Sequence, residues 1–505
     1  MSGSDAMRRA WAFALLAGLV SALLMSVRLG DPGYWIDEIY TARWTRLSVG
    51  GLLAALATDL HPPLFFLIER LCARAWGEGE MALRALPLLA GAATVPLAFW
   101  AFRPALGDRR ALLVSWVVAF SPGFALYSRM ARYYSLAALT ALIAHGLFAR
   151  LASGRNRFVL WAIYTLAVAL ALSTSYMTAC LIAAHGIWAF AVDRSRRLFL
   201  GWLAAVAAAA LLLAPWWLVA TRQIGQAHGL LPALSGGAKG WALMLGYELH
   251  ALIAGEVLFP WEPAGVVALV CGLILLVRGI RVAAGEARTR WLLHSAVVAL
   301  VLASALLTVL ARATPFVGLP GRTLYLWPFA AAFGVLGACT ARLPGRWLGA
   351  GWVACMLVGW VHLRAADHVL NPIYLTPGRE AARDIARDAA PTDAVLAEHD
   401  TGVGYYLERL SFPGRVSTPG DFPASIRSGV DVPTSVWWAR LSRDGSARLQ
   451  PGDGVGEWIE RGGILMRRTN YGRVDPVLAE LKHRLLGKPP YEHRLRVERY
   501  GLAGH

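Results

Sequence analysis

The chain has 505 residues, of which 57% are hydrophobic and 16% charged, and its mean hydropathy is +0.49. Soluble globular domains usually carry about 25% charged residues, so this composition excludes an ordinary soluble protein. The formal net charge is +17. Much of that charge follows from arginines in alternate loops between apolar segments, so it reflects membrane topology and calls for no nucleic-acid partner.

Apolar segments of roughly 17 to 25 residues recur from the N-terminus to about residue 364, and each can cross a hydrocarbon core of about 30 Å as a helix. They cover residues 10–28, 82–102, 111–128, 133–150, 158–175, 177–192, 198–219, 264–281, 291–311, 323–341 and 348–364. Only a short turn separates the segments at 158–175 and 177–192, so the boundary between these two predicted helices is the least certain. The sequence therefore predicts a polytopic α-helical bundle of about 11 transmembrane helices.

Arginine sets the expected orientation, because basic residues in short loops stay in the cytoplasm. The alternate loops carry Arg8 and Arg9; Arg103, Arg109 and Arg110; Arg150, Arg155 and Arg157; Arg194, Arg196 and Arg197; Arg278, Arg281, Arg288 and Arg290; Arg342 and Arg346. This pattern predicts a cytoplasmic N-terminus. It also predicts a first loop, residues 29–81, and a C-terminal region that both lie outside the cytoplasm.

The C-terminal region differs in composition from the bundle. It becomes polar from Thr376 onward and predicts a helix at 379–390, a strand at 394–397, an amphipathic helix near 475–486 and a charged strand near 493–500. We therefore expect two domains, a transmembrane domain at 1–364 and a small extracytoplasmic α/β domain at 365–505.

The first outward loop carries an acidic pair, Asp37 and Glu38, flanked by the aromatic residues Trp35 and Tyr40. On a regular backbone these neighbours point in different directions, so only one of them reaches a given reacting atom, and we favour Asp37. A carboxylate here acts as a general base on a hydroxyl or as an oxygen ligand for a divalent cation. An alternative is that the pair caps a helix or forms ion pairs with arginines of the loop.

The same loop continues with His61-Pro62-Pro63 and a predicted interfacial helix at Leu64–Trp76. Pro62 and Pro63 fix φ and lack a backbone N–H donor, so they make the backbone after His61 rigid. We therefore expect His61 to be mainly a structural hydrogen-bonding group, and we also include it in the candidate substrate pocket. Glu248, His250 and Glu256, in the later loop at 221–263, are further candidates for the acceptor side.

Arginines at outward helix ends are the candidates for binding an anion. Arg129 and Arg132 precede Tyr133 and Tyr134, and a spacing of three residues places the two arginines on one face of a helix, where they can grip a phosphate. Arg322, followed by Tyr325, stands at the expected start of another helix. The alternative is that these arginines bind lipid headgroups or snorkel to the interface.

Four motifs carry a resemblance to a known family. They are Trp35-Ile36-Asp37-Glu38, His61-Pro62-Pro63-Leu64-Phe65-Phe66, Glu80 to Pro87 and Ser128 to Leu136. In order and spacing they resemble the GT-C membrane glycosyltransferases. The nearest branch holds the protein O-mannosyltransferases, the aminoarabinose transferase of lipid A and the galacturonosyltransferases of rhizobial lipopolysaccharide core.

The resemblance implies an inverting glycosyltransferase that takes a sugar from a polyprenyl-phosphate carrier at the outer face of the bacterial cytoplasmic membrane. It places the family's acidic residue at Asp37 and its basic residues near the carrier phosphate at Arg129, Arg132 and Arg322. The acceptor is then an envelope glycan, a glycolipid or a protein. Met130 stands where members often have an acid, which weakens any metal ligand at this helix end.

No cofactor is implied beyond a divalent metal at Asp37 or Glu38. The candidate substrate pocket comprises Trp35, Tyr40, His61, Tyr133, Tyr134 and Tyr325. Two other functions stay open: a lipid or glycan transporter or flippase, and an inactive relative that binds glycan. A transporter of this size often repeats one half in the other, and the sequence shows no such repeat.

Overall fold

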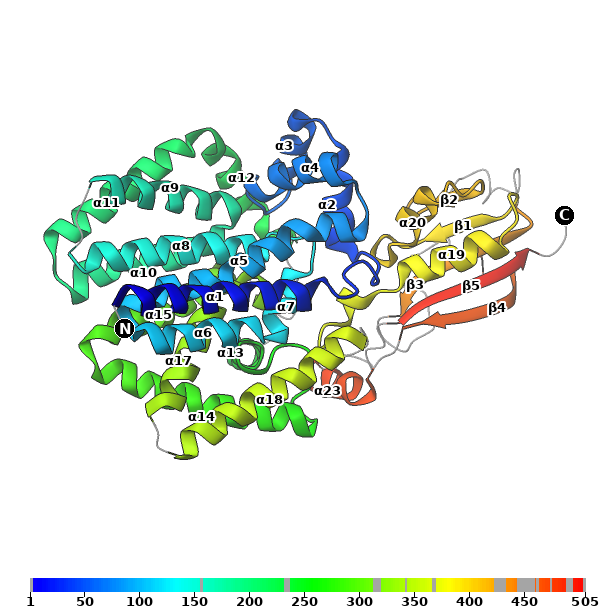
Figure 1. Cartoon of the computed structure of the whole chain (residues 1–505). Coiled ribbons are helices and arrows are strands. Elements are labelled where there is room, and N and C mark those ends of the chain that lie inside the picture. Colours follow the sequence, from blue (N-terminus) through cyan, green and yellow to red (C-terminus); the bar gives the residue numbers. More distant parts are fainter. Residues whose placement is uncertain are drawn as a thin grey trace. The chain divides into compact units, whose positions relative to one another are not determined.

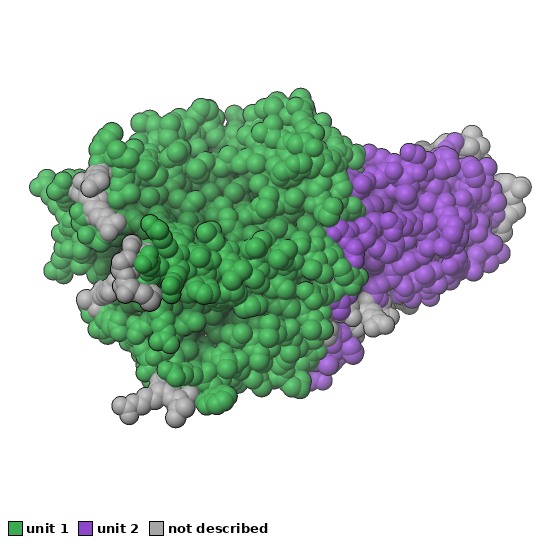
Figure 2. Space-filling view, in the orientation of Figure 1, with its two compact units in different colours: residues 1–29, 41–364 green, residues 30–40, 365–505 purple. Residues whose placement is uncertain are grey.

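The fold is described from a computed structural model of the whole chain (Figure 1). The residues described are 3–154, 158–230, 237–311, 319–340, 343–365, 369–421, 433–442, 459, 463–472, 475–486 and 494–502. The chain divides into two compact units, coloured separately in Figure 2. Unit 1 comprises residues 1–29 and 41–364, and unit 2 comprises residues 30–40 and 365–505. The predicted domains at 1–364 and 365–505 stay a prediction, because compactness does not show that either part folds alone.

Helices are the regular elements of unit 1 in its described residues. Its longer helices are α1 (Gly3–Ser26), α5 (Glu80–Leu106), α6 (Asp108–Ala119), α7 (Pro122–Ser128), α8 (Tyr134–Ala152), α9 (Phe158–Thr174), α10 (Ala179–Ile187), α11 (Arg196–Leu212), α12 (Ala214–Leu230), α13 (Gly237–Ala254), α14 (Pro263–Gly285), α15 (Ala287–Ala311), α17 (Trp327–Thr340) and α18 (Leu343–Ala365). Short turns of helix lie at η1 (Tyr176–Thr178), η2 (Trp188–Val192), α16 (Leu319–Arg322) and η3 (Leu324–Leu326). Every predicted apolar segment therefore coincides with helix.

Six of the described helices are long and apolar enough to cross a membrane, or up to eight if each bent pair is one span. Three further predicted spans correspond to shorter apolar helices, at Phe158–Thr174, Tyr176–Val192 and Leu324–Thr340. These helices and the fold comparison below make this a multi-pass membrane protein, while the count of about 11 spans stays a prediction.

Two predicted spans are each broken into two helices. Within 111–128, α6 and α7 meet at 61°, and within 198–219, α11 and α12 meet at 86°. At the first break the Ser121 hydroxyl accepts a hydrogen bond from the Phe124 N–H at 3.0 Å, and Pro122 begins the new helix. Pro215 follows the second break. A proline lacks the N–H that would continue the helix before it, so the helix breaks at each of these positions, which apolar length alone does not reveal.

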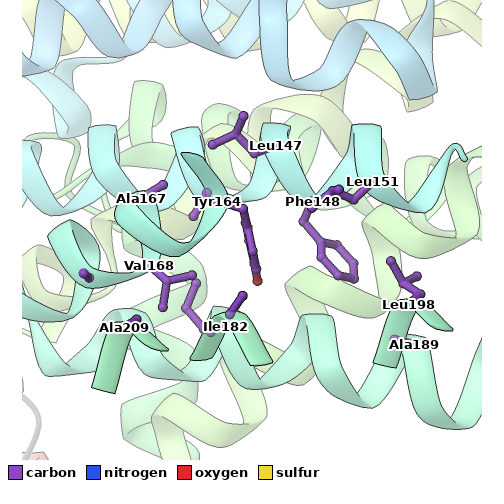
Figure 3. Close-up of a cluster of buried hydrophobic side chains, with 13 residues drawn as sticks. Leu147, Phe148, Leu151, Tyr164, Ala167, Val168, Ile182, Ala189, Leu198 and Ala209 are labelled. Carbon is purple, nitrogen blue, oxygen red and sulfur yellow. The ribbon is translucent and has the colours of Figure 1, made fainter. Parts of the chain in front are cut away.

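The helices pack through side chains of ordinary core type. One cluster lies between α8, α9, α10 and α11 and is built on Phe148, Tyr164, Val168 and Ile182 (Figure 3). Nearby, an added Cβ on Gly146 of α8 would lie 2.1 Å from the Trp100 ring of α5. The absence of a side chain at this glycine therefore lets the indole of α5 pack directly on α8.

The first outward loop is more regular than predicted. It contains α2 (Ile36–Arg46), α3 (Val49–Ala57) and α4 (Leu64–Trp76). The helix predicted at Leu64–Trp76 is confirmed with the same bounds, while its place at the membrane interface stays a prediction. Asp37 and Glu38 both lie in the first turn of α2. Negative side chains are favourable there, since the first turn exposes unpaired N–H groups.

Unit 2 contains a five-stranded sheet in the order β2-β1-β3-β5-β4. The strands are β1 (Ala394–Ala397), β2 (Arg415–Ser417), β3 (Ser435–Ser442), β4 (Gly463–Tyr471) and β5 (Arg494–Leu502). Strand β1 pairs in parallel with β2 and β3, whereas β5 pairs antiparallel with β3 and β4. The predicted α/β fold of this part is confirmed. Strands β2, β3 and β4 were not predicted.

The helices of unit 2 are α19 (Gly378–Asp388), α20 (Val403–Arg409) and α23 (Pro476–Leu486), with short turns η4 (Pro372–Leu375) and η5 (His399–Thr401). The sequence predicted α19 and α23 but not α20. The charged strand β5 lies inside the sheet, between β3 and β4, and its Glu498 is fully buried there. The Glu498 carboxylate forms ion pairs with Arg440 and Arg468, both at 2.7 Å. A paired and hydrogen-bonded charge is the form in which proteins bury carboxylates.

Candidate active site

Glu38 caps the helix that carries the acidic pair. Its carboxylate accepts a hydrogen bond from the Trp35 backbone N–H at 3.3 Å, and the residue is 1% exposed. An acid three residues into a helix that reaches back to the N-terminal N–H is the capping-box arrangement. Asp37 lies in the same turn but is partly exposed. Glu38 thus caps α2, and Asp37 is the more exposed of the two acids.

The aromatic neighbours of the pair lie in different environments. The Trp35 ring is buried and packs edge-on against Tyr374, with the ring centroids 4.8 Å apart. Tyr40 is 38% exposed, and its ring centroid is 5.3 Å from that of His399. Trp35 therefore supports the start of α2. Of these two candidates for the substrate pocket, only Tyr40 offers an accessible face.

His61 stands between an acid and an arginine in unit 1. Its Nε2 lies 3.0 Å from Nη2 of Arg132, and its Nδ1 lies 3.0 Å from Oδ1 of Asp59. A guanidinium only donates, so Nε2 accepts, which leaves Nδ1–H to donate to the Asp59 carboxylate. His61 is therefore neutral and holds Arg132, as expected of a structural hydrogen-bonding group.

The electrostatics of this group agree with its geometry. Burial, followed by the charge of Arg132, lowers the pKa of His61, and the charge of Arg322 contributes in the same direction. Burial alone would raise the pKa of Asp59, but hydrogen bonds from His61 and the Leu60 N–H, with the Arg132 charge, hold it well below its ordinary value. The charges of Arg132 and Arg322 therefore both favour the neutral form of His61. Asp59 supplies the negative charge on the other side of the imidazole ring, at Nδ1.

Arg132 is enclosed by groups that fix its position. It is 2% exposed, donates to the Thr41 hydroxyl at 3.5 Å and lies 5.7 Å from the ring centroids of Phe66 and Tyr133. The ring centroids of Tyr133 and Tyr134 are 4.8 Å apart. The structure thus brings His61, Arg132, Tyr133 and Tyr134 together, and Arg322 acts on the same centre through its charge.

The prediction that Arg129 and Arg132 share a helix face is wrong. Residues 129–133 form the turn between α7 and α8, so helical spacing does not apply to them. Arg129 instead donates to the carbonyl oxygens of Val27 at 3.1 Å and Arg28 at 3.0 Å, just beyond the end of α1. Arg129 therefore holds the segment that directly follows α1.

The segment 319–327 lies against two buried acids of α13 and the turn after it. Glu248 accepts from the Thr323 hydroxyl, and Glu256 accepts from the hydroxyls of Tyr127 and Tyr247. A small pocket is lined by Gly123, Tyr127, Ala251, Leu252, Gly255, Glu256, Pro320, Leu324 and Trp327. Of the acceptor-side candidates, Glu256 lines this pocket, while Nε2 of His250 hydrogen-bonds the Leu258 carbonyl at 2.9 Å. Tyr325 is buried in η3.

Glu248 is expected to make stability depend on pH. Burial, partly offset by the hydrogen bond from Thr323, raises the pKa of its carboxyl from 4.5 to about 7. The folded state therefore binds more protons than the unfolded state between these values, and stability falls as the pH rises through them. The loss is on the order of 3 kcal/mol above pH 7.

Glu248→Gln carries no charge and should therefore be the more stable protein at pH 8 but not at pH 4. Thermal unfolding of the purified protein in detergent at both pH values measures this difference. Glu480→Gln, at an exposed ion pair with Arg484, is the control. Equal effects of the two substitutions at pH 8 would contradict the role given to Glu248.

Among the described residues, no group of three or more His, Cys, Asp and Glu side chains is arranged to hold a metal ion. The divalent metal at Asp37 or Glu38 thus remains a prediction from the sequence alone. The capping bond of Glu38 commits one of its oxygens to the backbone.

The chain is similar to known proteins in part of its sequence and in its fold. Residues 60–219 match the family model described as dolichyl-phosphate-mannose-protein mannosyltransferase. No curated protein matches the sequence.

Solved structures match most of the chain. ArnT from Cupriavidus metallidurans bound to undecaprenyl phosphate is similar with a TM-score of 0.55 at 13% identity, over 98% of both chains. Its apo state gives 0.59 at 12% identity, over 97% of this chain and 98% of that one. The apo Archaeoglobus fulgidus oligosaccharyltransferase gives 0.50 at 14% identity, over 85% of this chain and 69% of that one. In fold, therefore, the chain is similar to ArnT over nearly its whole length, and membership of the GT-C superfamily stays a prediction from its motifs.

Proposed function

We propose that the protein is an inverting glycosyltransferase that moves a sugar from a polyprenyl-phosphate carrier to an envelope acceptor. The observation that carries the proposal is Arg132, a buried arginine fixed by the neutral His61, with the charge of Arg322 acting on the same histidine. Two guanidinium groups suit the phosphate of a lipid carrier, because fork-shaped donors bind phosphate oxygens in pairs. The fold supports the proposal, since it is shared with a protein solved with undecaprenyl phosphate bound.

In the proposed reaction Asp37 accepts the proton of the acceptor hydroxyl. The hydroxyl oxygen forms a bond to the anomeric carbon while the bond from that carbon to the phosphate oxygen breaks on the opposite face. The configuration inverts, and the lipid phosphate leaves with the bonding electrons. Arg132 and Arg322 stabilise the negative charge that grows on the phosphate, which is usually the largest contribution in such transfers. Arg129 is left out of this set because it holds the segment that directly follows α1.

The proposed location is the bacterial cytoplasmic membrane, with the N-terminus in the cytoplasm and unit 2 on the outer side. The arginine pattern of the loops supports this orientation. The acceptor is then a molecule of the cell envelope: lipid A or core oligosaccharide, another lipid-linked glycan or a protein.

Deletion of the gene followed by mass spectrometry of envelope glycolipids and glycoproteins tests the proposal. We expect one species to lose the mass of a single sugar and to regain it when the wild-type gene is restored. In detergent, the purified protein should also release free polyprenyl phosphate from a polyprenyl-phosphate sugar only when the acceptor is present. A transporter or an inactive glycan-binding protein would bind its ligands but release no lipid phosphate.

A further inference from the structure

We propose that unit 2 positions the catalytic acid, with Tyr406 and Arg379 as the positioning residues. The segment that leads into α2 and carries Asp37 belongs to unit 2, although more than 300 residues separate it from the rest of that unit. The role given to Asp37 rests on the proposed function, whereas the contacts that hold its segment do not depend on it.

Tyr406 holds the residue before the helix. The phenolic oxygen of Tyr406, on α20, accepts a hydrogen bond from the Tyr34 backbone N–H at 2.6 Å. Both residues are buried, so the bond forms away from competing water. An N–H just before the helix has no partner inside it, and this phenol supplies one. The position of the first turn, with Asp37 three residues later, therefore depends on α20.

Arg379 holds the segment further upstream. Its guanidinium, on α19, donates to the Gly30 carbonyl at 2.9 Å and to the Asp31 carbonyl. Between these anchors, an added Cβ on Gly33 would lie 3.2 Å from both the Tyr406 hydroxyl and the Arg379 Cβ. The segment thus passes closely over both positioning residues, and a glycine permits the approach.

A third group of contacts fixes the other side of the turn. The Trp35 ring packs edge-on against Tyr374. Gly402 has φ +68°, and an added Cβ there would lie 2.8 Å from Cδ1 of Ile39. Residues 30, 31, 34, 35 and 39 are therefore all held by parts of the chain that follow residue 370. Contacts on several sides keep the segment that carries Asp37 in place. A displacement of a reacting group by about 1 Å costs on the order of 100-fold in rate.

Tyr406→Phe, Arg379→Ala and the control Arg387→Ala test the proposal in the full-length protein. Arg387 lies on the same helix as Arg379 but is exposed and pairs only with Asp384 and Asp388 among the contacts described. We expect kcat for sugar transfer to fall about 10- to 100-fold in the first two variants. The KM for the polyprenyl-phosphate sugar should stay unchanged, and Arg387→Ala should behave as wild type.

Hydrogen exchange measured on peptides covering residues 30–40 provides a readout that does not need activity. Exchange there should rise in Tyr406→Phe and Arg379→Ala while the bundle helices keep their protection. If Arg379→Ala fails to accumulate, Tyr406→Phe alone decides, because it removes only one oxygen.

Unchanged kcat in Tyr406→Phe, or a raised KM with kcat intact, overturns the proposal. So does unchanged exchange over residues 30–40. A wild-type protein without transferase activity would instead overturn the proposed function and the role of Asp37, while the exchange experiment would still measure the hold on this segment.

Discussion

The Asp37→Asn protein is expected to lose sugar transfer, with kcat reduced about 10²- to 10⁴-fold, the usual contribution of a general base. Asparagine has nearly the same shape as aspartate and still suits the first turn of α2, but it cannot accept the proton of an acceptor hydroxyl. Membrane accumulation and thermal unfolding should therefore match wild type. Release of lipid phosphate from a polyprenyl-phosphate sugar, measured with the purified protein, gives the rate.

Glu38→Gln is the matched control for this experiment. The glutamine carbonyl oxygen can still accept the hydrogen bond from the Trp35 N–H, so the cap of α2 is kept and transfer should stay within a few-fold of wild type. Glu38→Ala removes the cap and should lower stability by about 0.5–2 kcal/mol. The opposite result, an active Asp37→Asn and an inactive Glu38→Gln, would exchange the roles of the two acids.

Local signals in the sequence were sufficient for much of the fold. Membrane-length apolar segments predicted helices at every expected position, and the mixture of apolar and charged residues at helical spacing gave α4 its bounds, Leu64–Trp76. Pro122 and Pro215 marked the two breaks in the sequence, but an apolar count extends across them. The capping role of Glu38 was also readable as an acid three residues after the start of a helix, once that helix is known.

Long-range contacts could not be predicted in the same way. Helical spacing suggested that Arg129 and Arg132 act together. Yet Arg129 binds Val27, 102 residues away in the sequence, and Arg132 binds His61, 71 residues away. Likewise, nothing near Tyr34 in the sequence indicates that Tyr406 completes its hydrogen bonding. The sequence therefore supplies candidate residues for the site, while the contacts of each candidate depend on the fold.

Arg132→Gln is expected to lower kcat/KM for transfer about 10²- to 10³-fold, the range seen when one group that stabilises developing charge is removed. Glutamine can still donate one hydrogen bond to His61, but it brings no positive charge to the leaving phosphate. Arg132→Lys should recover only part of the loss, because an ammonium lacks the fork that binds two phosphate oxygens. Steady-state kinetics with varied polyprenyl-phosphate sugar measure both variants.

The pH profile separates this effect from a general loss of structure. The Arg132 charge is a cause of the lowered pKa of His61, so its removal should raise that pKa. His61 would then gain a proton at higher pH than in wild type, and because its imidazolium replaces part of the missing positive charge, the residual activity of Arg132→Gln should rise relative to wild type on acidification. Arg129→Gln is the control, because it removes the hydrogen bonds to Val27 and Arg28. It should lower the unfolding temperature while the folded protein keeps its KM and pH profile. If Arg129→Gln instead raised the donor KM as strongly as Arg132→Gln, the phosphate would have to be bound at the end of α1 and the assignment of Arg132 would fail.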